Sequence, residues 1–225
     1  MAVNVIMLGP PGAGKGTQGE RFAMRHRIPR IATGEILRDE MHAGTPLGKA
    51  VKDVIDRGEL VGDQVMIDIV TERLSRPDVQ NGFVLDGFPR TVAQAESLDK
   101  LMASRDVLIV LDIVVPEAEL ARRLGARMIC ESCGHNADGR ETKPGVCHFC
   151  GGTLTQRADD NAAVVLERFK IYTTATKPLV DFYRTRPTFR SINGAQSLDR
   201  VAADLNAAVE DIANGAGMAS GGSKR

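Results

Sequence analysis

Short apolar runs alternate with longer segments of helical periodicity along most of this chain. Residues 3–8, 83–85 and 107–115 are apolar enough to form buried strands of a parallel sheet. Weaker extended segments are predicted at 28–31 and 189–192. Because strands that alternate with helices form a parallel sheet wrapped on both faces, the pattern predicts an α/β fold with a doubly wound sheet of five strands.

Helical periodicity fills the intervals between these strands. The spacing of apolar positions predicts helices at residues 15–26, 34–41, 46–57, 63–75, 91–103, 116–126, 161–183 and 199–213. Residues 215–225 are rich in glycine and serine, and we expect them to form a frayed tail.

Two segments are longer than the connections of such a sheet require. The first insertion, residues 32–61, contains two predicted helices where one would be enough, and the second insertion, residues 127–160, has little apolar periodicity. We expect both to be small mobile domains inserted into a discontinuous core of residues 1–31, 62–126 and 161–225. Because ligands of parallel sheets bind at the carboxyl ends of the strands, an insertion hinged over these ends is well placed to act as a lid.

Composition narrows the class of protein. The chain has 225 residues, enough for one large domain with small insertions and a substantial core. Its 29 basic residues balance 29 acidic residues, which gives no reason to expect binding to nucleic acid or to a membrane surface. The N-terminus lacks a secretion signal and no run approaches the length of a membrane span, so we expect a cytoplasmic protein.

The strongest chemical signal follows the first predicted strand. Residues 9–17 read Gly-Pro-Pro-Gly-Ala-Gly-Lys-Gly-Thr, a glycine-rich turn between a buried strand and a helix. Such a turn brings backbone N–H groups around a phosphate, the helix N-terminus attracts the anion, and Lys15 adds a positive charge. The general phosphate-loop pattern has Ser or Thr directly after the lysine, whereas here Gly16 precedes Thr17. An ordinary glycine-rich turn is the alternative, which the strand, the spacing and the lysine together disfavour.

All four cysteines lie in the second insertion. Cys130 and Cys133 form one C-x2-C pair, Cys147 and Cys150 form another, and a glycine follows each pair. Two such turns supply four thiolates for a tetrahedral, structural Zn²⁺ site, which would stabilise a segment too small to have a core of its own. The alternatives are a redox dithiol pair, a site in which His148 replaces a cysteine, and a zinc ribbon that binds nucleic acid. The scarcity of aromatic residues in the segment disfavours the last of these.

An acidic residue ends the strand at 83–85. Asp86 could hold Mg²⁺ through water, as in other phosphate-loop enzymes, or it could cap the helix that follows. The Mg²⁺ role is favoured because the phosphate loop is expected on the neighbouring strand.

Arginines lie beside each of these features. They are Arg38, Arg90, Arg123, Arg127, Arg157 and Arg168. Arg123 and Arg127 lie one helical turn apart where the second insertion leaves the core. Arg157 and Arg168 lie where the insertion returns to the core. A single arginine on a helix usually pairs with a surface acid, but four around one insertion are suited to collecting phosphate oxygens in bidentate pairs.

Together these motifs resemble those of the adenylate kinase family, over essentially the whole chain up to about residue 213. The resemblance depends on residues 9–17, 32–38, 58–61, 83–91 with Gln94, the pair Arg123 and Arg127, and 157–161 with Arg168. It implies the reaction ATP + AMP ⇌ 2 ADP with Mg²⁺, which maintains adenine nucleotide balance, in a monomer. The catalytic residues it implies are Lys15, Arg90, Arg123, Arg157 and Arg168.

The resemblance also implies two nucleotide sites. ATP would be held by Gly12, Ala13, Gly14, Lys15, Gly16, Thr17, Arg123, Arg127 and Gln196. AMP would be held by Thr33, Arg38, Glu59, Leu60, Val61, Gly87, Phe88, Pro89, Arg90, Gln94, Arg157 and Arg168, with Gln94 reading the adenine edge. The first insertion would be the AMP-binding domain, and the second would be the zinc-bearing lid of the long bacterial form.

The chain departs from the family pattern at three places. Glu35 stands where the family usually has aspartate, the interval between the two cysteine pairs is shorter than in the common form, and Asn136 and Ala137 lie where a Tyr-His pair is usual. The last two changes concern contacts from the lid to the ATP base and leave the four sulfur ligands in place.

Two other functions compete with this interpretation. One is a kinase for UMP, CMP or GMP, although Gln94 and Thr33 favour adenine. The other is a nucleotide-sensing or nucleic-acid-binding zinc protein without turnover, which would be expected to lack phosphate-site cations that this chain retains.

Overall fold

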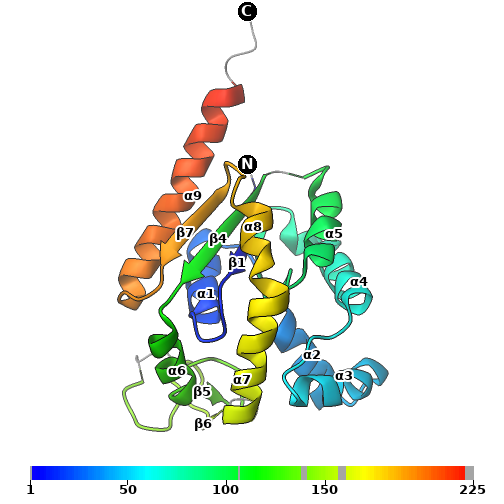
Figure 1. Ribbon diagram of the computed structural model, residues 1–225. Helices are drawn as coiled ribbons and strands as arrows, with labels where there is room; N and C mark the ends of the chain where they lie inside the picture. The colour runs from blue at the N-terminus through cyan, green and yellow to red at the C-terminus, as the bar shows by residue number, and fades with distance from the viewer. Residues whose placement is uncertain (1, 106, 138–140, 157–160, 221–225) are drawn as a thin grey trace, which may run out of the picture.

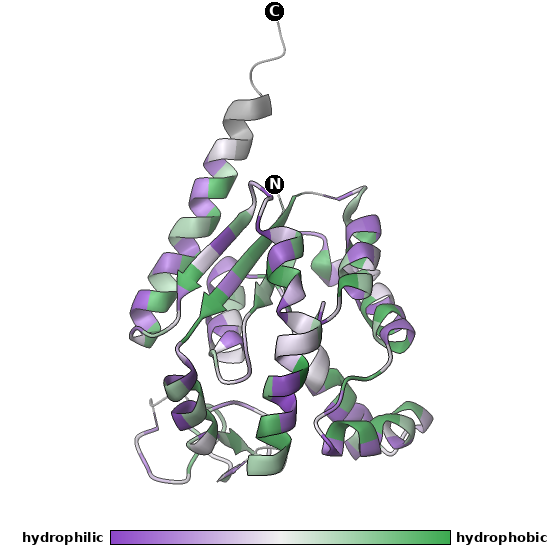
Figure 2. Ribbon diagram, in the orientation of Figure 1, coloured by the Kyte–Doolittle hydropathy of each residue, from purple (hydrophilic) through white to green (hydrophobic). Residues whose placement is uncertain are grey.

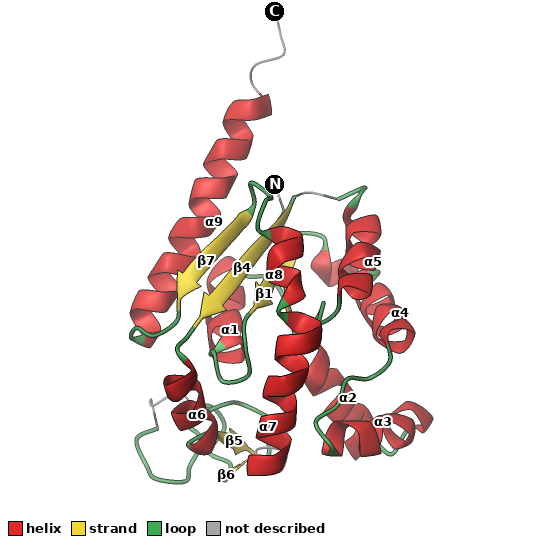
Figure 3. Cartoon of the chain, in the orientation of Figure 1, coloured by secondary structure: helices red, strands yellow, loops and turns green. Residues whose placement is uncertain are grey.

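A parallel five-stranded sheet forms the centre of the molecule, with the strand order β2-β3-β1-β4-β7 (Figure 1). The computed structural model describes residues 2–105, 107–137, 141–156 and 161–220. Helices cover both faces of the sheet, so the predicted doubly wound α/β fold is confirmed (Figure 3). The strands of this sheet are β1 (Val3–Leu8), β2 (Arg30–Ala32), β3 (Gly82–Asp86), β4 (Leu108–Val114) and β7 (Phe189–Asn193).

The helices follow the predicted ranges closely. They are α1 (Lys15–His26), α2 (Thr33–His42), α3 (Pro46–Asp56), α4 (Asp63–Leu74), α5 (Val92–Met102), α6 (Glu117–Gly125), α7 (Ala162–Ile171), α8 (Pro178–Tyr183) and α9 (Leu198–Ser220), with a 3₁₀ turn at Pro77–Val79. Within the second insertion, where the sequence showed little apolar periodicity, β5 (Met128–Cys130) and β6 (Leu154–Gln156) form an antiparallel pair.

The two faces of the sheet bury alternate residues of each strand. Ile6 and Leu8 of β1 pack in a cluster with residues of α4, α5 and α8, whereas Val5 and Met7 pack with α1 and α9. All four side chains are at most 4% exposed. Burial on both faces explains why the strand is apolar throughout instead of alternating. Figure 2 shows β4 as mostly hydrophobic, with Asp112 as its one charged residue, while the edge strand β7 carries several hydrophilic residues.

The predicted helix at 161–183 is interrupted. α7 gives way to a π-helical turn at Tyr172–Thr176, and α8 begins at Pro178. Pro178 has no N–H with which to continue the helical hydrogen bonds, and the hydroxyl of Thr173 donates to the carbonyl of Phe169 at 2.9 Å. One periodic segment therefore becomes two helices.

The C-terminal helix is longer than predicted. The frayed tail expected at 215–225 is wrong for residues 215–220, because α9 continues to Ser220; residues 221–225 lie outside the described part of the chain. Val201, Leu205 and Val209 anchor the helix on the sheet. Once a helix is nucleated, each further residue adds a backbone hydrogen bond at little cost. None of the described helices is both long and apolar enough to cross a lipid bilayer.

The carboxyl ends of the strands point to one edge of the sheet, and both insertions lie there. Helices α2 and α3 of the first insertion lie on one side of α7, and α6 with β5 and β6 lies on the other (Figure 1). This arrangement places residues from distant parts of the sequence around one space.

Candidate active site

A cleft of about 760 Å³ opens at the carboxyl edge of the sheet, and both insertions contribute to its walls. The register of the sheet pairs Met7 with Asp86 and Leu8 with Asp112, so three neighbouring strands end at the same level. The segments that follow β1 and β3 therefore open into the same space, as ligand sites of parallel sheets do.

The loop after β1 has the backbone geometry that anion binding requires. Gly12 and Gly14 have φ values of +83° and +93°, which L side chains rarely adopt. A Cβ at Gly12 would also lie 3.1 Å from the carbonyl oxygen of Leu120. No described side chain caps α1, which begins at Lys15. Its first N–H groups are therefore available to a phosphate.

Lys15 lines the cleft close to the positive charges of Arg90 and Arg127. Its Nζ donates to the carbonyl oxygens of Gly9 and Pro10 at 2.7 and 2.9 Å. Burial lowers the pKa of Lys15 to about 8; Asp86 opposes this shift, and the nearby charge of Arg90 reinforces it. A cation held in this way is stabilised when an anion enters.

Arg90 is a second cation of the cleft whose charged form is disfavoured by its surroundings. Its side chain is accessible to water in the cleft, yet the surrounding protein lowers its pKa, opposed by Asp86 and reinforced by the charges of Arg168 and Arg38. Its Nε donates to the carbonyl oxygen of Gly87 at 3.0 Å. Arginines from three separate segments thus repel one another across the cleft. A polyanion between them would relieve this repulsion.

Asp86 is the last residue of β3. It lies beside the glycine-rich loop at residues 9–17 that follows β1, which we call the phosphate-type loop. Its carboxylate accepts a hydrogen bond from Arg30 at 3.1 Å. The alternative role as a helix cap does not hold, because the N-cap of α5 is Thr91, whose hydroxyl accepts from the N–H of Gln94 at 3.3 Å.

Gln94 is buried at the wall of the cleft, and its amide is fixed from both ends. Its Oε1 accepts from the backbone N–H of Arg90 at 2.8 Å, and its Nε2 donates to Asp63 at 2.8 Å. These two bonds decide which end of the amide is the oxygen. Each end retains capacity for one more hydrogen bond.

Most residues predicted for nucleotide binding line this cleft. They are Gly12, Ala13, Gly14, Lys15, Gly16, Thr17, Thr33, Arg38, Glu59, Leu60, Val61, Gly87, Pro89, Arg90, Gln94, Arg123, Arg127, Arg168 and Gln196. Phe88 does not, because its side chain is buried in the core between the sheet and α4, α5 and α8. Arg157 lies outside the described residues.

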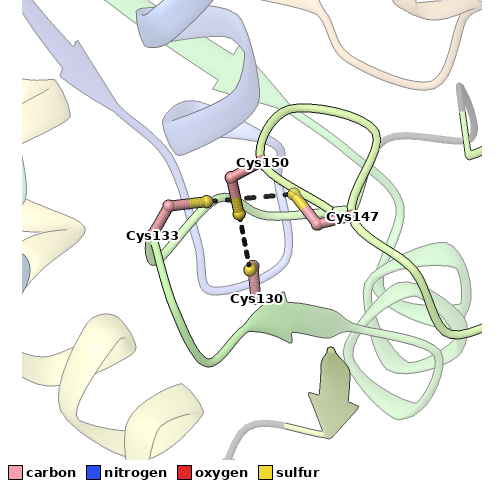
Figure 4. Close-up of side chains that lie close together, drawn as sticks. All are labelled: Cys130, Cys133, Cys147 and Cys150. Atoms are coloured by element: carbon pink, nitrogen blue, oxygen red, sulfur yellow. Dashed lines mark hydrogen bonds between the residues drawn. The ribbon is translucent and has the colours of Figure 1, made fainter. Parts of the chain in front are cut away.

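The four cysteines form one compact cluster. Their sulfur atoms point toward a common centre (Figure 4), and all lie within 4.8 Å of one another. The Sγ atoms of Cys130 and Cys150 are 3.4 Å apart, and those of Cys133 and Cys147 are 3.8 Å apart. A tetrahedral site with Zn–S bonds of ~2.3 Å has sulfurs ~3.8 Å apart, so the cluster fits zinc.

Two alternatives for the cysteines are disfavoured by this geometry. Both of these S–S contacts join different C-x2-C pairs, and all four sulfurs lie within 4.8 Å of one another, as in a tetrahedral site, whereas a redox dithiol would join the two cysteines of one pair. His148 belongs to a separate group with His135 and Glu141, so it does not replace a sulfur ligand. The four thiols themselves are all free of disulfide bonds.

Comparison with known proteins decides the family. A family model described as adenylate kinase matches residues 7–188. A protein called adenylate kinase from Archaeoglobus fulgidus is 43% identical over 215 residues, which cover 93% of this chain and 99% of that protein. Another from a Geobacillus species is 47% identical over 208 residues, covering 90% and 96%, and one from Rhizobium etli is 40% identical over 216 residues, covering 93% and 100%. The chain belongs to the adenylate kinase family.

The departures from the adenylate kinase pattern have structural consequences. Glu35 accepts a hydrogen bond from Arg30 at 2.5 Å, so the longer acid is paired. Asn136 and Ala137 line the cleft, and the Nδ2 of Asn136 lies 3.7 Å from the position of a Cβ at Gly16. The second insertion therefore reaches the phosphate-type loop despite the shortened interval between its cysteine pairs.

Two charged residues close to the site were not predicted from the sequence. Arg30 bridges Asp86 and Glu35, but it lies in a weak extended segment that carries no motif. Asp112 is buried at the end of β4, where burial raises its pKa and Lys15 opposes the shift. The sequence did contain a signal for Asp112, because a single acidic residue inside the apolar run 107–115 is unusual for a buried strand.

Proposed function

We propose that the chain catalyses reversible transfer of a phosphoryl group from ATP to AMP, giving two ADP. The observation that carries the proposal is the convergence of Lys15, Arg38, Arg90, Arg127 and Arg168 on one cleft beside a loop with free helix N–H groups. Membership of the adenylate kinase family supports the same reaction.

On the ATP side, the phosphates would bind the loop at 12–17. Arg123 lines the same cleft as this loop and is oriented by hydrogen bonds to Glu119 at 2.8 Å and to the carbonyl oxygen of Gly194 at 2.9 Å. Arg127 would close on the same phosphates, and backbone groups near Gln196 would contact the adenine.

On the AMP side, the base and the phosphate would bind different walls. Gln94 lines the cleft together with Thr33 and residues 59–61, and we propose that it pairs with adenine there. Arg38 and Arg90 would hold the AMP phosphate, and Arg168 would contact the phosphates between the two nucleotides. Arg157, outside the described residues, would act beside Arg168.

The reaction needs alignment and charge neutralisation rather than a general base. The acceptor oxygen of AMP is already ionised at neutral pH, and the described lining of the cleft contains neither histidine nor cysteine. The obstacle is repulsion between two polyanions, which Lys15 and the arginines would reduce as the phosphates align. Mg²⁺ bound to ATP supplies further charge neutralisation, and Asp86 would hold it through water.

The two insertions would supply movement. We propose that the first insertion is the AMP-binding domain and that the second is the lid, each moving against a core of residues 1–31, 62–126 and 161–225. Closure over the loop at Gly16 would exclude water, so that ATP is not hydrolysed in the absence of AMP. Because one chain supplies every described wall of the cleft, we expect an active monomer.

Zinc is the metal that fits the four-cysteine cluster best. The pKa of Cys133 is raised, first by burial and then by the neighbouring sulfurs, because four thiols this close cannot all ionise without a cation. All four sulfurs would bind the ion, so its role would be to stiffen the lid.

A coupled assay of ADP formation tests the proposed reaction. With ATP and Mg²⁺ as donor, AMP is expected to be converted rapidly and UMP, CMP and GMP slowly. Fast conversion of another monophosphate would reassign the substrate, and absence of turnover with every acceptor would favour a nucleotide-sensing protein.

Proton uptake on ATP binding is expected near pH 8.5. The pKa of Lys15 is lowered to about 8 by burial, so the amine is mostly neutral at that pH; a bound triphosphate raises its pKa and the amine takes up a proton. At pH 7 Lys15 is already protonated in the free protein, so it contributes no proton uptake when ATP binds. Isothermal titration calorimetry in two buffers of different ionisation enthalpy measures the difference, and equal uptake at both pH values would show that the pKa of Lys15 is not lowered in the free protein.

Replacing Gln94 with alanine is expected to raise the KM for AMP roughly 10- to 100-fold and to leave kcat nearly unchanged. A contact to the base is made equally in the ground state and the transition state, so its loss weakens binding without slowing chemistry. Gln64→Ala is a matched control, because Gln64 is an exposed glutamine of α4 that bonds only Asp68 among the hydrogen bonds described. A variant Gln94→Ala with unchanged KM for AMP would show that the amide does not read the base.

A further inference from the structure

A second group of metal-ligating side chains lies in the second insertion, beside the cysteine cluster. One ring nitrogen of His135, one of His148 and one carboxylate oxygen of Glu141 all lie within 4.8 Å of one another. The four sulfurs complete a tetrahedral site by themselves, so these three residues are not needed there.

His135 is prepared as a ligand by its surroundings. Its side chain is 5% exposed, and its Nε2 has no hydrogen-bond partner among the described residues. Its Nδ1 faces the carboxylate of Glu20 on α1, with the oxygens at 3.3 and 3.4 Å. A carboxylate in this position holds the proton on Nδ1 and leaves the lone pair of Nε2 for a metal, as in carboxylate–histidine–metal arrangements.

Glu141 and His148 complete the donor set. Their side chains are 13% and 20% exposed, and the Glu141 Oε1 lies 3.5 Å from the His148 Nδ1. Ligand atoms bound to one tetrahedral ion at ~2.0–2.1 Å are ~3.4 Å apart, so this spacing suits a shared cation. Without an ion, the buried Nε2 of His135 would remain unsatisfied, which proteins usually avoid.

We propose that His135, Glu141 and His148 bind a second divalent transition metal ion, with Glu20 as the positioning residue of His135. Two imidazoles and one carboxylate suit Zn²⁺, Co²⁺ or Ni²⁺ and disfavour Mg²⁺ and Ca²⁺, which prefer oxygen ligands. Three protein ligands leave a position for water. Because Glu20 lies on α1 of the core, the occupied site links the second insertion to the helix that begins at Lys15.

Metal stoichiometry tests this proposal. Tag-free protein that already holds one zinc per chain is titrated with Ni²⁺ by calorimetry, and elemental analysis verifies the cysteine-bound zinc afterwards. We expect one further equivalent of Ni²⁺ to bind. Binding of no further equivalent would overturn the proposal.

Variants locate the site. Glu141→Gln and His148→Asn are each expected to weaken Ni²⁺ binding more than 100-fold while the zinc is retained, and Glu20→Gln to weaken it about 10- to 100-fold. The exposed His42 provides the control, because His42→Asn should leave Ni²⁺ binding unchanged. Undiminished Ni²⁺ binding in the double variant of Glu141 and His148 would place the ion elsewhere and contradict the assignment.

Discussion

Replacing Arg90 with alanine is expected to lower kcat/KM by a factor of roughly 10³–10⁵, the range that a single arginine contributes to phosphoryl transfer in related chemistry. Arg90 follows β3 directly after a glycine turn, and its guanidinium shares the cleft with Lys15, Arg38 and Arg168. The loss would be large because the charge is needed where oxygens develop negative charge, in a site that excludes water. The coupled assay with ATP and AMP measures the effect.

The fold is expected to survive this change. Arg90 is surrounded by other cations, so removing it relieves repulsion and should leave the melting temperature unchanged or slightly higher. Arg184→Ala is the matched control, because Arg184 is an exposed arginine paired with Asp181 on α8 and should alter neither activity nor stability appreciably. Near-normal turnover in folded Arg90→Ala protein would remove Arg90 from the mechanism.

Replacing Cys147 with serine is expected to release the cysteine-bound metal and to lower the melting temperature by ~6–12 °C. Zinc ligation supplies ~10–16 kcal/mol in isolated finger peptides, and a loss of only ~3 kcal/mol would shift the melting temperature of a domain of this size by that amount. The cluster around Cys147 has few apolar residues to compensate, since Cys130 and Leu154 are its only other buried members in the described part of the chain. Elemental analysis and scanning calorimetry give the two readouts.

A chelator should reproduce the effect in the unmodified protein. Glu141→Gln serves as the control for both experiments, because it removes a proposed ligand of the second site and leaves the four sulfurs intact. Verified loss of the cysteine-bound metal with an unchanged melting curve would contradict the structural role of zinc. Lower ADP formation is expected to accompany the lower melting temperature, since a softened lid closes poorly.

Much of the fold could be predicted from the sequence because the signals are local. The apolar run at 3–8 and the glycines and lysine that follow it define a buried strand, a turn and a helix start within one stretch of chain. The cysteine spacing predicted a cluster for the same reason, since two turns with glycine at Gly134 and Gly151 in the left-handed conformation direct the sulfurs inward. The end of α9 was missed because helix extension depends on a nucleus packed elsewhere, not on the composition of the tail.

The sequence by itself determined which chemical groups this protein has and in which order they come; the tertiary structure decided which of them meet. Arg30 pairs with Asp86 from another strand, and Glu20 of α1 faces His135 of the second insertion. No periodicity or spacing encodes such pairs, because their partners are brought together by strand order and by the packing of insertions on the core. For the same reason, the phosphate-type loop is visible in the sequence, while arginines from distant segments line one cleft with it only in the folded chain.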